Sequence, residues 1–162
     1  MTDKRIIYTL PDGTVSVVVP SDDFLAEFKG TTTEALAAIR ERAVPAEATN
    51  VTTVLSAVIP NDRTFRNAWT QGSGTVSVDM PQARVIHMNR IREVRNDELK
   101  KEDINFQRAL ESEDASAKAT VATKKQTLRD IPQSFDLSGA GTGDELDALW
   151  PSELPERTPD GA

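Results

Sequence analysis

Residues 82–112 read QARVIHMNRIREVRNDELKKEDINFQRALES and contain neither glycine nor proline. Because these two residue types end or break helices, the stretch predicts one long helix. The preceding residues Asp79-Met80-Pro81 suit a helix start, since aspartate can cap and proline is tolerated in the first turn. At 1.5 Å per residue the helix spans roughly 45 Å. That is longer than a small core needs.

The apolar face of this helix is interrupted by charged residues, so we expect it to be only partly buried. Arg95 and Asp103 fall close to this face, and we expect them to pair. The acid-rich residues 111–114 predict a turn and a new helix start. Apolar residues then recur at helical spacing until Ile131-Pro132, where the second helix is expected to stop. The two helices predict an antiparallel hairpin.

The N-terminal region has the pattern of a small sheet. Residues 5–9 and 15–19 are rich in β-branched side chains and flank Pro11-Asp12-Gly13, which predicts a β-hairpin. Residues 51–59 predict a further strand that pairs with it. Residues 65–69 indicate one or two helical turns, and residues 75–78 indicate a short extended run that we expect at the sheet edge.

Between these strands, two short helices are expected. One follows Ser21 and stops at Gly30, and the next begins with Thr31 and Glu34, the form of a capping box. Val44-Pro45 ends the second helix. We therefore expect a strand-strand-helix-strand unit with one helix-covered face.

The last part of the chain changes character again. Residues 138–143 are a Gly/Ser/Ala-rich linker, and Thr142 with Glu145 forms another capping box before a short apolar helix that Pro151 ends. The predicted fold class is α+β. The predicted divisions are an α+β head at 1–79, a helical hairpin at 80–135, and a linker, short helix and acidic proline-rich tail at 136–162.

Composition removes many functions. The 162 residues include no cysteine and one histidine, His87, which excludes disulfides, thiolate metal sites and a multi-histidine metal centre within one chain. The chain shows neither a secretory leader nor an apolar run near the roughly 18 residues of a membrane span. We expect no membrane contact, no cofactor and no metal.

Charge is distributed unevenly along the chain. Residues 1–80 carry 7 basic and 10 acidic side chains, residues 81–135 carry 11 and 9, and residues 136–162 carry 1 and 7, so the nets are −3, +2 and −6. Such a tail is most often a solvated terminus, and less often an arm that docks on a basic partner. The tail is our candidate for a partner-facing arm.

Local spacing predicts no catalytic site. His87 has no nucleophile or orienting carboxylate placed beside it, so a surface or helix-seam histidine is the simpler interpretation. Three acidic pairs are explained by helix caps or solvated faces. An enzyme that uses a carboxylate pair remains a third hypothesis. These pairs are Asp22-Asp23, Glu102-Asp103 and Asp144-Glu145.

A second hypothesis is a small DNA-binding regulator. The only concentration of basic residues is on the long helix, at Arg84, Arg90, Arg92 and Arg95. These residues do not form one stripe at 100° per residue, and the sequence pI of about 4.8 opposes binding to a phosphate backbone. We therefore expect nucleic acid not to be a partner, and keep this function as the alternative.

Short runs along most of residues 5–151 resemble small tail-region proteins of tailed bacteriophages and prophages, in the group called tail fibre assembly or tail assembly chaperone-like. The runs are Ile6-Ile7-Tyr8-Thr9 with Asp12-Gly13, Ala43-Val44-Pro45, Asp62-Arg63-Thr64-Phe65-Arg66-Asn67-Ala68-Trp69, Met80-Pro81, Ala83-Arg84, Ile86-His87, Ile91-Arg92, Arg95, Leu99, Asp103, Ala109-Leu110-Glu111, Lys125-Gln126, Leu128-Arg129-Asp130 and Leu149-Trp150-Pro151.

The resemblance implies a non-enzymatic protein that acts by protein-protein contact, either as a component of the phage particle or as a tail fibre assembly factor. Its partners would be other phage structural or tail proteins, or further copies of this chain. It would be made in the host cytoplasm and located in the tail region of the virion. The residues that we expect to contact partners are large apolar side chains at the predicted junctions, namely Trp150, Leu149, Leu146, Trp69 and Phe106.

Overall fold

The computed structural model of the chain describes residues 3–157. It divides the chain into two compact units, Met1–Asp79 and Met80–Ala162. Unit 1 contains the strands and two helices, and unit 2 contains a hairpin of two long helices and a short C-terminal helix. The α+β class predicted from the sequence is confirmed.

Unit 1 is built on a three-stranded antiparallel sheet in the order β2-β1-β3. Strands β1 (Lys4–Thr9) and β2 (Val15–Val18) form the predicted hairpin, with Ile7 opposite Val17. Gly13 adopts φ of 86° in the connecting turn, a conformation that glycine takes without steric cost. The Leu10 N–H closes the turn on the Thr14 carbonyl at 2.9 Å.

The two predicted helices lie between β2 and β3, but Ser21 makes no side-chain cap hydrogen bond and the first helix ends before the predicted stop at Gly30. Helix α1 spans Asp22–Glu27, and α2 spans Thr32–Ala43 behind the Thr31 capping box. Strand β3 spans Thr49–Leu55 and pairs with β1. The predicted strand over residues 51–59 is thus wrong at its end, because Ser56–Val58 forms a 3-10 turn instead.

A separate two-stranded sheet completes unit 1. Strands β4 (Trp69–Gln71) and β5 (Val76–Val78) pair with each other in antiparallel orientation. The expectation that residues 75–78 extend the first sheet is therefore wrong, since the loop at 72–75 folds β5 back onto β4. The predicted helical turn before β4 is present as the 3-10 helix Arg66–Ala68.

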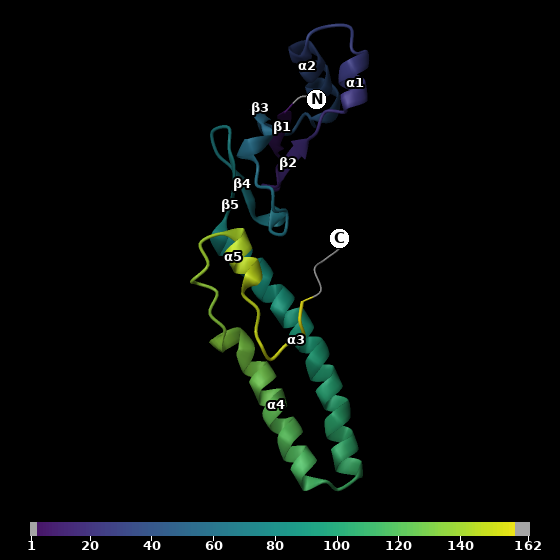
Figure 1. Ribbon diagram of the computed structural model, residues 1–162, viewed down its shortest axis with the longest axis vertical. Coiled ribbons are helices and arrows are strands. Elements are labelled where there is room, and N and C mark those ends of the chain that lie inside the picture. The colour runs from purple at the N-terminus through teal and green to yellow at the C-terminus, as the bar shows by residue number, and fades with distance from the viewer. Residues whose placement is uncertain (1–2, 158–162) are drawn as a thin grey trace. The chain divides into compact units, whose positions relative to one another are not determined.

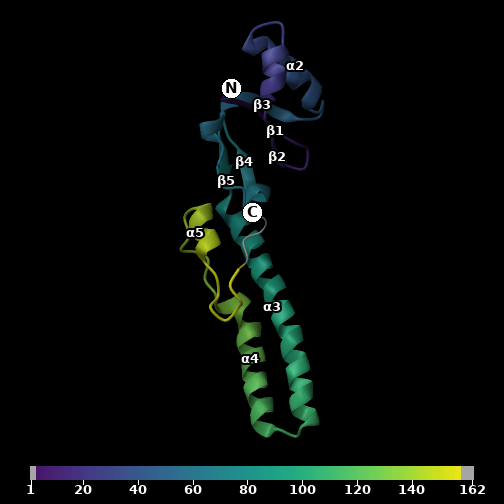
Figure 2. The ribbon, with the colours of Figure 1, turned by 45° about the vertical axis from the view of Figure 1, so that its right-hand side comes forward.

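The three-stranded sheet lies between the α1–α2 pair and the β4–β5 hairpin (Figures 1 and 2). Neighbouring residues on a strand point to opposite faces, and Ile6 and Ile7 are both fully buried. Ile7 joins a core cluster with Val15, Val54, Trp69 and Val76. The sheet is therefore covered by helices on one face, as expected, and the β4–β5 hairpin covers the other.

Unit 2 is organised around helix α3, which spans Met80–Glu111 without interruption. Helix α4 (Ala115–Ser134) returns along it, and Asp114 caps α4 by accepting the Ala117 N–H at 2.9 Å. The predicted hairpin is present. The turn between the helices places Glu113 at φ of 54°, the left-handed conformation that ends many helices.

The predicted stop of the second helix at Ile131-Pro132 is wrong, because α4 continues to Ser134 with Pro132 inside its last turn. Proline lacks the N–H that would bond four residues back, so only one helical hydrogen bond is lost so close to the end. The Ile131 carbonyl still accepts the Phe135 N–H at 2.9 Å. Ile131 is also buried, which favours the extra turn.

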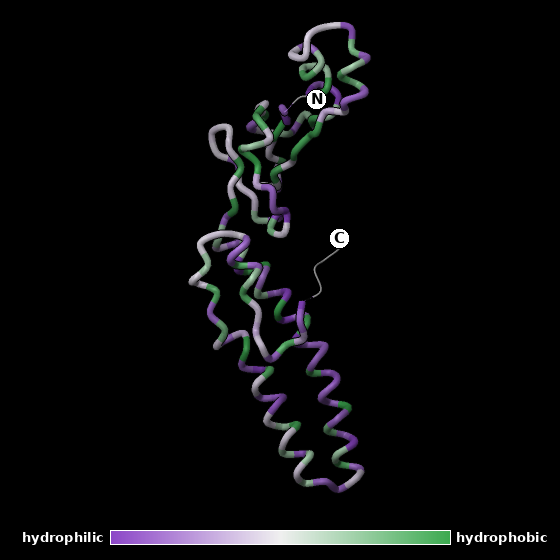
Figure 3. Tube along the Cα trace, viewed as in Figure 1, coloured by the Kyte–Doolittle hydropathy of each residue, from purple (hydrophilic) through white to green (hydrophobic). Residues whose placement is uncertain are grey.

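The short helix α5 (Gly143–Ala148) begins with the predicted Thr142 and Glu145 capping box. Beyond it the chain continues to residue 157 without further helix or strand. The predicted proline-rich tail reaches into residues 158–162, which lie outside the described residues. Figure 3 shows that the ends of α3 and α4 at their connecting turn are mostly hydrophilic, whereas the strands of unit 1 are richer in apolar residues.

Candidate protein-contact surface

Residues 136–157, here called the C-terminal segment, pack within unit 2. Leu146 is fully buried and Leu154 is 6% exposed. Arg84 of α3 donates hydrogen bonds to the backbone carbonyls of Leu137, at 3.1 Å, and Ala140, at 2.8 Å. The described residues 136–157 are therefore held to unit 2 and do not project from it, and their role as a partner-facing surface stays a prediction. Their backbone carbonyls and apolar side chains hold them to the fold.

His87 lies at the centre of this packing. Its side chain is fully buried, its Nε2 lies 2.7 Å from the Leu149 carbonyl oxygen, and its ring meets Trp150 edge-on with centroids 5.9 Å apart. Burial lowers the pKa of His87, while the Leu149 carbonyl opposes that shift. His87 is thus the helix-seam histidine that the sequence suggested, and it links α3 to the residues after α5.

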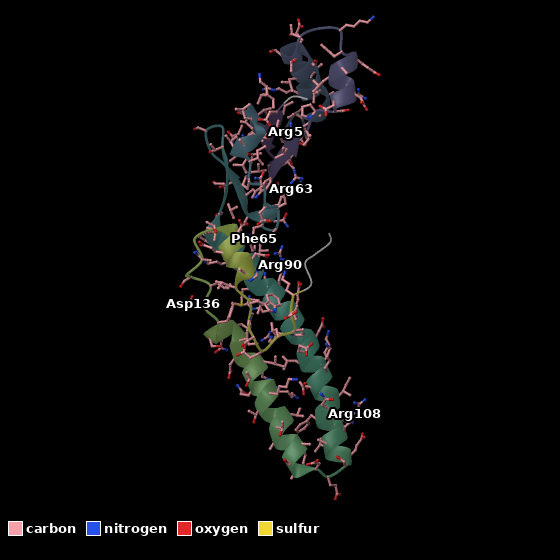
Figure 4. All side chains as sticks on the ribbon, viewed as in Figure 1. Arg5, Arg63, Phe65, Arg90, Arg108 and Asp136 are labelled. Carbon is pink, nitrogen blue, oxygen red and sulfur yellow. The ribbon has the colours of Figure 1, made fainter. Side chains whose placement is uncertain are left out.

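Two ion pairs fasten the same region. Asp147 of α5 accepts from Arg157 and lies 3.9 Å from the Arg90 guanidinium, which Figure 4 labels on α3. Trp150 Nε1 donates to the Pro155 carbonyl at 2.9 Å, which closes the chain after α5 into a compact turn. Part of the acidic excess at residues 136–157 is therefore neutralised by α3 itself.

An open groove of about 440 Å³ lies between α3 and the end of the C-terminal segment. Trp150 and Pro155 contribute its aromatic and apolar surface, and Val94 lines the α3 side. Charged residues form the rest of the lining: Arg90, Glu93, Asp97, Glu98, Lys101, Glu156 and Arg157.

The cations of this lining are already engaged. Arg90 and Arg157 face Asp147, and Lys101 pairs with Glu98 at 2.6 Å. Within residues 3–157, no such partner is found for the carboxylates of Glu93 and Glu156. The groove thus combines a half-buried tryptophan with a small excess of negative charge.

The five predicted contact residues fall into three places. Leu146, Leu149 and Trp150 come together at α5, where Leu149 and Trp150 are half-buried. Trp69 is 4% exposed and belongs to the core cluster of unit 1, and Phe106 is half-buried far along α3. Leu146 and Trp69 are buried by their own units, so among the five the exposed apolar surface belongs to Leu149, Trp150 and Phe106.

Phe106 belongs to a second part of unit 2, which we call the distal part (residues 96–127). There Glu102 of α3 bonds Lys124 of α4 at 2.6 Å, and Asp103 pairs with Lys125 at 2.5 Å. The Lys125 ammonium also lies 5.2 Å from the Phe106 ring centroid. Charged groups therefore connect the two helices here.

The predicted pair of Arg95 and Asp103 does not form, because eight residues of helix separate them by about 12 Å. Glu102 is 5% exposed, and its hydrogen bond to Lys124 holds the pKa of its carboxyl below the ordinary value. The ion pairs of Lys124 and Lys125 were not predicted, because they depend on how α4 is placed against α3. Spacing within either helix carries no such signal.

The acidic pairs do not converge. Asp22 and Asp23 are exposed in unit 1, and Asp144 and Glu145 lie in the first turn of α5. Among the described residues, no group of three or more histidine, cysteine, aspartate or glutamate side chains is placed to hold a metal ion. A helix long and apolar enough to cross a membrane is likewise not found in that part of the chain.

Comparison of the chain with protein-family models, with curated proteins and with solved structures found no match. The resemblance to phage tail-region proteins therefore stays a prediction from sequence patterns.

Proposed function

We propose that the chain is a non-enzymatic, tail-region protein of a tailed bacteriophage or prophage that acts by protein-protein contact. It would serve either as a component of the particle or as a tail fibre assembly factor. The observation that carries this proposal is the groove between α3 and the C-terminal segment, with Trp150 in its wall. Tryptophan in a partly desolvated hollow is the side chain that most often dominates binding energy at protein interfaces.

The charges around the groove support a partner of defined chemistry. Glu93 and Glu156 add negative charge that the cations of the lining do not neutralise. A partner that places a lysine or arginine over the Trp150 ring would gain a cation–π contact and meet these carboxylates. We therefore propose a basic segment of another tail protein as the occupant.

The distal part of the hairpin supports a contact function by a different route. Ile104 and Leu110 of α3 are 56% and 49% exposed, although isolated exposed apolar residues are common on protein surfaces. Glu102 and Ala109 are the buried residues of the range 96–127. A hairpin whose helices bury so little against each other can present most of its length to partners.

The contacts of the arginines weigh against the DNA-binding alternative. Arg84 is held by backbone carbonyls of the C-terminal segment, Arg90 faces Asp147, and Arg92 donates to Asn89 at 2.9 Å. Insertion into a DNA groove would require several of these contacts to be given up. The acidic C-terminal segment beside them would also repel phosphates.

Two substitutions test the proposal together. Trp150→Ala is expected to weaken particle assembly far more than it lowers the melting temperature of the purified protein, although loss of its contacts with His87 and Pro155 costs some stability. Leu146→Ala is the matched control, because it removes a buried side chain four residues earlier, on α5, and acts through stability. If assembly merely follows melting temperature across both variants, the contact proposal is wrong.

Mass spectrometry of gradient-purified particles separates the two forms of the function. Stoichiometric copies in the particle indicate a structural component. Absence from particles, together with defective assembly when the gene is deleted, indicates an assembly factor. Normal assembly without the gene and absence from particles would reject both.

A further inference from the structure

Strand β3 is an edge of the three-stranded sheet, and its outer side has no neighbouring strand among residues 3–157. Its sequence, TNVTTVL at 49–55, contains no charged residue and no proline. Charged side chains and proline are two of the devices by which proteins prevent unwanted pairing at sheet edges, and β3 has neither. Thr52, Thr53 and Leu55 are exposed, with Leu55 at 52%. The edge is therefore exposed, and no charged residue or proline of β3 prevents another strand from pairing with it.

The hydrogen bond directly after β3 shows which of its residues direct their backbone groups toward β1 and which direct them outward. The Ser56 N–H donates to the Asp3 carbonyl at 2.8 Å, so the backbone of residue 56 points toward β1. Backbone groups alternate in direction along an antiparallel strand, which places Thr52 and Val54 in the same inward phase. Thr53 and Leu55 consequently direct their N–H and C=O groups outward. The same alternation places Val51 outward, directly after the register shift at Asn50, which has φ of 53°.

The other side of β1 agrees with this phase. The Leu10 N–H bonds the Thr14 carbonyl across the β1–β2 turn, so even-numbered residues of β1 face β2 and odd-numbered residues face β3. Arg5 and Ile7 are the odd-numbered partners of Val54 and Thr52. The Asn50 carbonyl accepts hydrogen bonds from the side chains of Gln71 and Thr52. The proposed contact begins after it, at Val51.

We propose that the outer edge of β3 pairs with β3 of a second copy of this chain, antiparallel and centred on Thr53. In this register each outward-facing residue meets an outward-facing residue, so the two Thr53 residues face each other and Leu55 faces Val51 of the second copy. The half-exposed Leu55 side chain gains an apolar cross-strand neighbour. The two-fold axis forms both Leu55–Val51 pairs at once.

The charge of β3 does not oppose a second copy at this edge. The whole chain carries a net charge of −7, which opposes self-association in general. Strand β3 contributes none of that charge, and the proposed register brings only Thr, Val and Leu side chains into direct opposition. Thus two copies can meet here without like charges in contact.

The size of the contact sets the expected strength. Three outward residues from each copy pair along a strand of about five residues, which buries well below the roughly 1,200 Å² of a typical stable interface. The dimer is therefore weak and concentration-dependent. It concerns unit 1, whereas the contact surface proposed above lies on unit 2, so each proposal can fail without the other.

Single cysteines test the register, because the chain has none of its own. In the full-length protein, Thr53→Cys places two thiols opposite each other at the axis, with Cα atoms about 5.5 Å apart. This lies within the range that a disulfide bridges. Thr52→Cys is the matched control, since the offset of two residues puts its Cα atoms about 8 Å apart, beyond that range.

We expect the Thr53→Cys protein to form disulfide dimers at least about ten times faster than the Thr52→Cys protein under mild oxidation. Equal rates for the two variants, whether fast or slow, overturn the proposal. Equal rates would mean that a second copy does not pair here, and a strand of a different protein would be the remaining occupant of the edge.

Sedimentation of the unmodified protein gives an independent measurement. The mean mass is expected to rise with concentration, and Thr53→Pro is expected to remove that rise. Proline at 53 removes an outward N–H and spares the bonds to β1. If the proline variant does not fold, Leu55→Lys is the substitute test, because it adds charge to the edge and is also expected to remove the rise in mass. A mass that stays monomeric at all concentrations, or one unchanged in both variants, contradicts the proposal.

Discussion

Helix α3 is packed by two different means along its length. Its first part, with residues 128–157, forms the proximal part of unit 2, where buried side chains such as Ile91, Leu146 and Leu154 form an apolar core. In the distal part the helix meets α4 through charged groups, and Glu102 is itself buried. One helix is thus anchored at one end by buried apolar side chains and held in register at the other end by ion pairs with α4.

The physical consequences of these two kinds of packing differ. Apolar burial contributes stability in proportion to area, whereas an ion pair with one exposed partner contributes little beyond the desolvation that it offsets. The proximal part should therefore supply most of the stability of unit 2. The distal part should open more easily and remain available for contact.

The largest expected effect comes from a cavity in the proximal part. Leu146→Ala should lower the free energy of unfolding by about 2–5 kcal/mol, because Leu146 is fully buried. Phe106→Ala in the distal part should cost less, about 1–2 kcal/mol, since that ring is half-buried. Urea unfolding followed by circular dichroism measures both. Equal losses would remove the distinction between the two parts.

A smaller effect is expected from the distal ion pair. Lys124→Ala leaves the Glu102 carboxylate buried without its cation, and should cost about 1–2 kcal/mol after allowance for the exposure of Lys124. Lys100→Ala is the matched control, because its pair with Asp97 is exposed on both sides and should change stability by less than about 0.5 kcal/mol. Identical effects in the two variants would mean that burial of Glu102 has no energetic consequence.

The proximal part should also respond to mild acid through His87. Its pKa is lowered in the folded chain, so the unfolded chain binds the proton more readily and stability falls as pH drops below about 6.5. Above that pH His87 is neutral in both the folded and the unfolded chain, so its burial no longer lowers the free energy of unfolding. His87→Gln should flatten the dependence of melting temperature on pH between about 7.5 and 5.5. A variant that keeps the full slope would assign the slope to other groups.

The smallest expected change stabilises the distal part. Glu113 adopts a left-handed conformation in the α3–α4 turn, which is unfavourable for a side chain with a Cβ. Glu113→Gly should raise the free energy of unfolding of the hairpin by about 0.5–1 kcal/mol. Hydrogen exchange of distal amides reports it directly. A decrease would show that the Glu113 side chain makes a contribution larger than the strain.

Local signals in the sequence were sufficient for much of the fold. The capping boxes at Thr31 and Thr142, the turn at Gly13 and the uninterrupted stretch of α3 all depend on residues within a few positions of one another. Each was predicted because the hydrogen bonds that define it are local. The prediction of fold class rests on these elements.

The errors concern contacts between distant residues. The partner of Asp103 is Lys125 on another helix, and the extra turn at Pro132 depends on burial of Ile131. The net charge of the C-terminal segment is visible in the sequence, whereas its anchoring to α3 by Arg84 depends on the fold. Of the candidate site, Trp150 was identified from its type and helical spacing, but the groove beside it required the fold.

Amide hydrogen exchange of the full chain, resolved by residue, tests the division of unit 2 most directly. We expect backbone amides around Ile91 to exchange only when unit 2 unfolds, and those around Glu102 to exchange through a local opening at least tenfold more populated, a difference of about 1.4 kcal/mol or more. Equal protection along α3 would contradict the account, since the helix would then open as one cooperative element.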